Sequence, residues 1–186
     1  MSKETINSHN MIEKDDSVLV VIDVQEKLMP VIADSKRVID NISTLLKFSH
    51  IIDLPVIQTE QEKLGSTVPE VKQEVSKCTP IGKITFDAFL CDELVEQIGK
   101  TKRNTLILTG VETHICVAQT ALHALPGFKV HVVSDGVSSR TGDNRTIGLE
   151  RMRQSGAVIT STEMVIYELL KRAGTDEFRQ TLKLVK

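Results

Sequence analysis

Short apolar, β-branched stretches alternate along the chain with longer stretches of helical periodicity, and this alternation limits the possible folds most strongly. The clearest apolar stretch is Val18 to Ile22, five consecutive aliphatic residues followed at once by Asp23. Such an unbroken run is typical of a strand buried on both faces of a parallel sheet. We predict five strands, over residues 18–23, 55–59, 105–110, 128–134 and 157–160.

The stretches between these strands carry the period of amphipathic helices. In the first of them, Val38, Ile42 and Leu45 fall on one stripe, and Ser35 is the expected N-cap. Helices are predicted over residues 35–53, 88–99, 113–125, 141–156, 161–173 and 176–184, whereas residues 60–82 are expected to be mostly an excursion. Strands that alternate with helices imply right-handed crossovers. We therefore predict a three-layer α/β/α fold with a doubly wound, Rossmann-like parallel sheet.

The length of 186 residues favours one domain. We assign residues 1–16 to a polar N-terminal arm and residues 17–186 to a single domain. Aromatic residues make up 3% of the chain and tryptophan is absent, so the core must be aliphatic.

Composition argues against two classes of partner. The net charge is −2 and there is no long basic run, so nucleic acid is not expected as a partner. The longest apolar run has five residues, against the ~20 needed to cross a bilayer, so a membrane is not expected either.

The N-terminus is polar and lacks the apolar segment of a signal peptide. Cys78, Cys91 and Cys116 form no CxxC pair, as expected for free thiols in a reducing compartment, and we predict a cytoplasmic protein.

In doubly wound folds, ligands bind beyond the carboxyl ends of the strands. Cys116 falls there, three residues after a candidate N-cap, Thr113, at the start of a helix. The unpaired N–H groups and dipole of a helix start would lower the pKa of a thiol. The alternative is that Cys116 is a small buried hydrophobic residue, the commonest role of a free cysteine.

Asp23 and Lys83 are the charged residues of interest at the same edge. Asp23 ends the first strand, and a carboxylate in that place either caps the next turn or acts as a general base. Lys83 lies in the segment PIGKITF, within reach if that segment crosses the edge; otherwise it is a surface lysine.

The histidines offer no partner for Cys116. His114 lies two residues before it, and helix positions i and i+2 point to different sides. There is no HExxH, CxxC or DxHxH pattern, and no GxGxxG or P-loop. We therefore predict neither a bound metal nor a nucleotide or other cofactor.

With Asp23, Lys83 and Cys116 in place, the chain resembles the isochorismatase-like cysteine hydrolase superfamily. The matching segments are VLVVIDVQEKLM, KITFDAF, LILTGVETHICVAQTAL and VHVVSDGVSSR, in the order and spacing of the superfamily. Two further segments, TEQEKLGSTVPE and ERMRQSGAVITSTEMVIYELL, resemble its isochorismatase domain-containing branch.

This resemblance implies a hydrolase that needs no cofactor. Cys116 would be the nucleophile, Asp23 the general base, and Lys83 the cation that holds both. The resemblance also implies a cis peptide bond between Val111 and Glu112, with the N–H groups of Glu112 and Cys116 as an oxyanion hole. A thioester intermediate would follow.

The chain departs from several branches of the superfamily. Metal-binding nicotinamidases carry Asp and His where this chain reads Gln58 to Gln61, and their pocket tryptophan has no counterpart here. Isochorismatases proper have no cysteine at the position of Cys116, so its presence favours hydrolysis of an amide or related acyl compound. The predicted pocket residues are Gln25, Leu28, Glu60, Gln61, Phe86 and Ile115. Because Glu60 would repel anions, we expect a small neutral or cationic amide.

Two other functions remain open. The chain could be a non-catalytic binding or scaffold protein that retains the hydrolase fold, or Cys116 could be a redox-sensing thiol. A small-molecule substrate is the expected partner, and a homo-oligomer the expected assembly.

Overall fold

The computed structural model describes residues 10–75 and 79–185 of the chain. Its centre is a six-stranded sheet in the order β3-β2-β1-β4-β5-β6, in which all neighbouring strands are parallel. The strands are β1 (Ser17–Ile22), β2 (Val56–Gln61), β3 (Ile81–Lys83), β4 (Thr105–Val111), β5 (Lys129–Ser138) and β6 (Val158–Thr160). The predicted three-layer α/β/α fold is confirmed.

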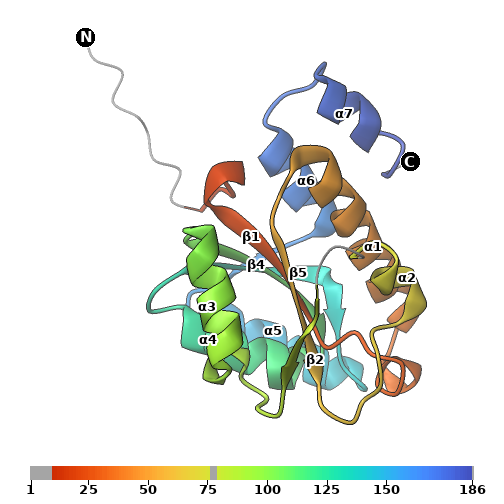
Figure 1. Ribbon diagram of the computed structural model, residues 1–186, viewed down its shortest axis with the longest axis vertical. Helices are drawn as coiled ribbons and strands as arrows, with labels where there is room; N and C mark the ends of the chain where they lie inside the picture. Colours follow the sequence, from red (N-terminus) through yellow and green to blue (C-terminus); the bar gives the residue numbers. More distant parts are fainter. Residues whose placement is uncertain (1–9, 76–78, 186) are drawn as a thin grey trace.

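Helices cover both faces of this sheet, as Figure 1 shows. They are α1 (Ser35–Ile52), α2 (Pro69–Lys72), α3 (Asp92–Thr101), α4 (Ala118–Ala124), α5 (Gly142–Gln154), α6 (Thr162–Leu170) and α7 (Asp176–Thr181). Three short 3₁₀ turns, η1 (Lys14–Asp16), η2 (Met29–Val31) and η3 (Ala88–Leu90), and one π-helical turn, η4 (Thr113–Val117), complete the elements.

The alternating side chains of the strands divide the interior into two aliphatic cores. Leu19 and Val21 of β1 face one core, which α1 and α6 cover. Val18, Val20 and Ile22 face the other, which α3, α4 and α5 cover. Because both faces are covered, the central strand is fully buried, and this explains its unbroken apolar run.

The sequence prediction missed one strand. Residues 81 and 82 fall at the end of the stretch expected to be mostly an excursion, yet residues 81–83 form β3 at the sheet edge, where Thr59 pairs with Ile81 and Gln61 with Lys83. A three-residue strand with a central glycine carries too little periodicity to be recognised. Its formation is decided by pairing with β2, and it places Lys83 in the sheet.

Several element ends also differ from the prediction. β5 continues to Ser138 instead of ending at Ser134, through a register shift between Leu108 and Gly110 of β4. The helix expected from residue 113 begins as the π turn η4, so Thr113 lies inside the turn and Glu112 at its N-cap. At the first helix, Asp34 rather than Ser35 occupies the N-cap position.

Of the predicted N-terminal arm, residues 1–9 lie outside the described residues. Residues 10–16 pack on the domain: the Asp16 carboxylate accepts hydrogen bonds from the backbone N–H of Asn104 (3.0 Å) and the hydroxyl of Thr105 (2.9 Å). Within the described part of the chain, no helix is both long and apolar enough to cross a membrane.

Close backbone approach between β1 and β4 shapes the carboxyl edge of the sheet. Gly110 has φ +112°, and a Cβ built on it would lie 2.0 Å from the carbonyl oxygen of Ile22. Only glycine fits there. Asp23, which directly follows β1, has a left-handed backbone (φ 55°), and its carboxylate meets Lys83 of β3 at this edge.

Candidate active site

Three chain segments meet at the carboxyl edge of the sheet and bring together the residues that the sequence singled out. Asp23 directly follows β1, Lys83 ends β3, and Cys116 lies in η4 after β4. β2 separates β3 from β1, so the lysine side chain must extend over β2 to reach Asp23.

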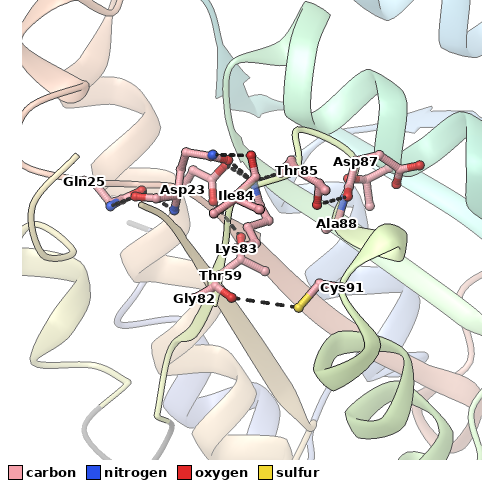
Figure 2. A network of polar contacts seen from close by, with 12 residues as sticks. Asp23, Gln25, Thr59, Gly82, Lys83, Ile84, Thr85, Asp87, Ala88 and Cys91 are labelled. Atoms are coloured by element: carbon pink, nitrogen blue, oxygen red, sulfur yellow. Dashed lines mark hydrogen bonds and ion pairs between the residues drawn. The ribbon is translucent and has the colours of Figure 1, made fainter. Parts of the chain in front are cut away.

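Asp23 and Lys83 form a buried ion pair (Figure 2). Lysine Nζ lies 2.6 Å from Oδ2 of Asp23, and both side chains are completely buried. Nζ also donates to Oε1 of Gln61 at 2.8 Å and to the carbonyl oxygen of Thr85 at 3.2 Å. The second carboxylate oxygen, Oδ1, accepts a hydrogen bond from the Thr59 hydroxyl at 2.8 Å. Each of the three lysine donors therefore has an acceptor, which is the condition for keeping such a pair out of water.

The Cys116 thiol interacts with both members of this pair, and its side chain is buried. The pKa of the thiol is raised to about 12: burial and the Asp23 carboxylate both raise it, burial the more, and the Lys83 ammonium lowers it. The expectation of a lowered thiol pKa at a helix start is therefore wrong. The physical reason is that η4 buries Cys116 among apolar residues next to a carboxylate, and desolvation opposes the charged form.

Glu112 connects β4 to η4. The peptide bond between Val111 and Glu112 is cis. The side chain of Glu112 is buried, and its carboxylate accepts hydrogen bonds from the backbone N–H of Arg140 (2.9 Å) and from Arg140 Nε (3.1 Å). Its charge is thus compensated by Arg140.

A cavity of about 90 Å³ opens beside Cys116. Its walls are formed by Asp23, Leu28, Gln61, Leu64, Phe86, Glu112, Ile115 and Cys116. Four of the six residues predicted for the pocket, Leu28, Gln61, Phe86 and Ile115, line it. Leu64 was missed because it lies in the supposed excursion; the loop turns back through a hydrogen bond from Lys27 N to Leu64 O (3.1 Å).

Gln25 and Glu60, the other two residues predicted for the pocket, do not line this cavity. The Gln25 amide donates to the carbonyl oxygens of Gln61 (2.9 Å) and Gly65 (2.7 Å), and its Oε1 accepts from Gln61 N (2.8 Å). The Glu60 carboxylate accepts from the backbone N–H and the hydroxyl of Thr67, both at 2.7 Å. Both side chains hold the loop after β2, so the argument that Glu60 repels anionic substrates is not supported.

Of the described histidines, His50, His114, His123 and His131, none lines the cavity. His114 Nδ1 lies 3.0 Å from the Ser139 hydroxyl, and His123 Nδ1 lies 2.6 Å from Asp87 Oδ2. His131 is buried in β5, where burial lowers its pKa to about 4. Among residues 10–75 and 79–185, no three His, Cys, Asp or Glu side chains are grouped so that they could hold a metal ion.

The chain has relatives among known proteins. The sequence profile of the isochorismatase domain matches residues 17–164. The secreted isochorismatase effector Isc1 of Phytophthora sojae is 40% identical to this chain over 91% of the chain and 84% of that protein. Isochorismatase domain-containing protein 2A of Mus musculus is 36% identical, over 91% and 82%.

Solved structures share the fold over nearly the whole chain. A structure described as the MAR1 ribonuclease of Caenorhabditis elegans superposes with a TM-score of 0.88 at 34% identity, covering 94% of this chain and 92% of that one. The YcaC gene product of Escherichia coli, described as an octameric hydrolase of unknown specificity, has a TM-score of 0.84 at 26% identity, covering 94% and 87%. YcaC of Pseudomonas aeruginosa, solved with hexane-2,5-diol and covalent acrylamide, has a TM-score of 0.88 at 26% identity, covering 95% and 92%. Sequence profile, relatives and fold agree that the chain belongs to the isochorismatase family and has its hydrolase fold.

Proposed function

We propose that the protein is a cysteine hydrolase that cleaves a small amide or related acyl compound through a thioester, with Cys116 as nucleophile, Asp23 as general base and Lys83 as their shared cation. The observation that carries the proposal is the completely buried Asp23–Lys83 ion pair, whose two charges act on the Cys116 thiol at the wall of a cavity. Placing a pair of charges in a protein interior costs free energy. Here the pair lies beside Cys116, which is the one cysteine among the residues that line the cavity.

The raised thiol pKa defines the first step. Because the resting thiol is protonated at neutral pH, the Asp23 carboxylate must take its proton as sulfur attacks the substrate carbonyl carbon. The C–S bond forms while the carbonyl π electrons move to oxygen. The N–H groups of Glu112 and Cys116 are the proposed donors to this oxyanion.

The remaining steps return every proton to its place. Protonated Asp23 gives its proton to the leaving nitrogen, the C–N bond breaks, and a thioester and a free amine or ammonia result. Asp23 then accepts a proton from water, whose oxygen attacks the thioester carbon. The C–S bond breaks, its electron pair stays on sulfur, and protonated Asp23 returns its proton to that sulfur. The acid leaves, and the thiol of Cys116 and the Asp23 carboxylate are restored. The Lys83 ammonium stays charged throughout and stabilises each anionic state of the pair.

The cavity limits the acyl group. Its volume is about 90 Å³. Leu28, Leu64 and Ile115 make its wall largely aliphatic, and Phe86 is its one aromatic side chain. These dimensions favour a short, neutral acyl group over an aromatic ring such as that of nicotinamide, and over a dicarboxylate such as isochorismate.

One relative is consistent with covalent chemistry in this fold. A covalent acrylamide in P. aeruginosa YcaC fits a fold that presents a nucleophile to a small electrophile. The ribonuclease description of the C. elegans relative makes RNA the second substrate to test. This chain has a net charge of −2, which does not favour the phosphate contacts on which RNA binding relies.

The proposal includes a homo-oligomer in the cytoplasm. Ile84, Phe86 and Leu90 are 70%, 56% and 62% exposed on the segment whose Phe86 lines the cavity, and a second copy of the chain would cover them. An octameric E. coli relative supports this assembly. Light scattering of the purified protein tests it.

The decisive experiment measures ammonia release from a panel of short aliphatic amides and ureido compounds, with and without chelator. The wild-type protein and Cys91→Ala are expected to turn over at least one of them, and Cys116→Ala none. RNA cleavage is assayed in parallel. If Cys116→Ala retains full turnover, the nucleophile is wrong; if no compound is turned over but small molecules bind at Cys116, the protein is the alternative, a non-catalytic binding or scaffold protein.

A further inference from the structure

The segment 84–90 completes the active-site cavity, and its first part, residues 84–87, contributes little to the apolar core. Thr85 supplies a carbonyl oxygen to Lys83 Nζ, and Phe86 forms part of the cavity wall. Ile84, Phe86 and Leu90 are all more than half exposed. Ala88 is buried and Phe89 packs against the core, so apolar burial anchors the η3 end of the segment. Residues 84–87 have no such anchor, and their position depends mainly on polar contacts.

Asp87 is the centre of those polar contacts. Its Oδ1 accepts a hydrogen bond from Phe89 N at 2.9 Å and so caps η3. Its backbone carbonyl accepts one from the Thr85 hydroxyl at 2.8 Å. Figure 2 shows Lys83, Thr85 and Asp87 as parts of one network. The position of the carbonyl that binds Lys83 thus depends on Asp87.

The second oxygen of Asp87 ties the segment to α4. Oδ2 lies 2.6 Å from Nδ1 of His123, which is near the end of the helix that follows the Cys116 turn. The His123 ring also packs on Phe89, with centroids 5.5 Å apart. One turn earlier on α4, the Thr120 hydroxyl accepts a hydrogen bond from Ala88 N at 3.1 Å.

We infer that His123 and Asp87 are positioning residues for the Asp23–Lys83–Cys116 site, which act through the hydrogen bonds from His123 to Asp87, from Thr85 to Asp87, and from Lys83 to Thr85. Neither residue lines the cavity, so neither touches substrate in this arrangement. Their effect is to keep segment 84–90 against α4, so that the Thr85 carbonyl remains available to Lys83 and the ammonium remains on Asp23. The inference goes beyond the proposed function and rests on it only where turnover is measured.

Two substitutions separate the hydrogen bond from the ring contact. His123→Asn retains an N–H donor near the position of Nδ1 but has no ring. His123→Phe retains a ring that can pack on Phe89 but has no donor. His50→Phe is the matched control, because His50 is an exposed histidine on α1, on the opposite face of the sheet.

The first measurement needs no substrate: the rate at which iodoacetamide alkylates Cys116 at one fixed pH, followed by mass spectrometry of the Cys116 peptide. When Lys83 moves away, the thiol loses the cation that favours its charged form, and alkylation slows. We expect His123→Phe to be about two- to fivefold slower than wild type, the size of effect of a partly exposed ion pair. His123→Asn and His50→Phe are expected to match wild type.

The second measurement is kcat and KM for an amide found in the panel. The kcat of His123→Phe is expected to fall by the same factor as its alkylation rate, while His123→Asn is unchanged. Equal rates in His123→Phe and wild type overturn the inference, as does a His123→Asn variant as slow as His123→Phe. If the wild type hydrolyses no amide, the proposed function fails, but the alkylation rates still decide the inference. His123→Ala replaces His123→Phe if the latter does not fold, with the same slowing expected.

Discussion

Lys83 Nζ lies 2.6 Å from Asp23 Oδ2 across the width of an intervening strand, and neither side chain is exposed to water. Sixty residues separate them in the sequence. The pair exists because β3 and the end of β1 flank β2 at the same edge of a parallel sheet. Each charge therefore depends on the other for its stability in the interior.

Removal of one member of this pair is expected to cost more stability than removal of both. Lys83→Met leaves the Asp23 carboxylate buried without its cation, and we expect a loss of about 3–5 kcal/mol in the free energy of unfolding. The double variant Asp23→Asn/Lys83→Met removes both charges and is expected to regain a large part of the stability that Lys83→Met loses. Urea unfolding of the two variants and the wild type measures this. A double variant less stable than Lys83→Met would contradict a mutually dependent pair.

As the pH is raised, the rate at which Cys116 is alkylated is expected to show no plateau near the pKa of an ordinary thiol. Because burial raises its pKa to about 12, the thiolate fraction and the alkylation rate should still be rising at about pH 10, above the ordinary value of about 8.5. Cys91, which is partly exposed, serves as the internal comparison in the same digest. A rate for Cys116 that levels off near pH 8.5 would show that the thiol is not desolvated as described.

Gly148→Ala is expected to disturb the Cys116 turn from a distance. A Cβ on Gly148 of α5 would lie 3.0 Å from the Cα of His114 in η4, so α5 or η4 has to shift. We expect a loss of stability of about 1–3 kcal/mol and slower turnover. Gly142→Ala, at the start of the same helix, has nothing within 4 Å of the added Cβ and is the matched control. If both variants behave alike in thermal unfolding and activity, the close helix contact does not position the turn.

Stability at acid pH is expected to depend on His131. Burial lowers its folded pKa to about 4, while the unfolded value is about 6.5, so the unfolded chain binds the proton more readily between these values. The contribution of neutral His131 to the free energy of unfolding is fully present above about pH 6.5 and is lost progressively as the pH falls towards 4. It amounts to about 3 kcal/mol.

The replacement His131→Leu tests this dependence, because an apolar side chain also removes two ring nitrogens that have no hydrogen-bond partner. We compare the free energy of unfolding of this variant and the wild type across that pH range, with His50→Leu as the surface control. The free energy of unfolding of the variant, relative to that of the wild type, should increase as the pH falls. A constant difference between the two proteins would mean that His131 does not titrate as described.

The sequence by itself determined the architecture and the main candidates for the chemistry. Continuous apolar stretches such as Val18 to Ile22 are readable because a strand covered on both faces must be apolar at every position. The amphipathic stripe of α1 is readable because only one side of a helix meets the core. Asp23 and Cys116 stood out because each follows a buried strand at the edge where such folds bind ligands.

Only the tertiary structure decided the state and surroundings of these residues. β3 is set by pairing with β2, and Lys83 depends on that pairing. Leu64 reaches the cavity, and Gln25 and Glu60 turn away from it, through contacts of the loop after β2 that no local periodicity encodes. The pKa of Cys116 is raised rather than lowered because burial and the Asp23 carboxylate act through space. Local pattern specifies which face of each element is apolar, whereas desolvation and charge depend on neighbours that only the folded chain brings together.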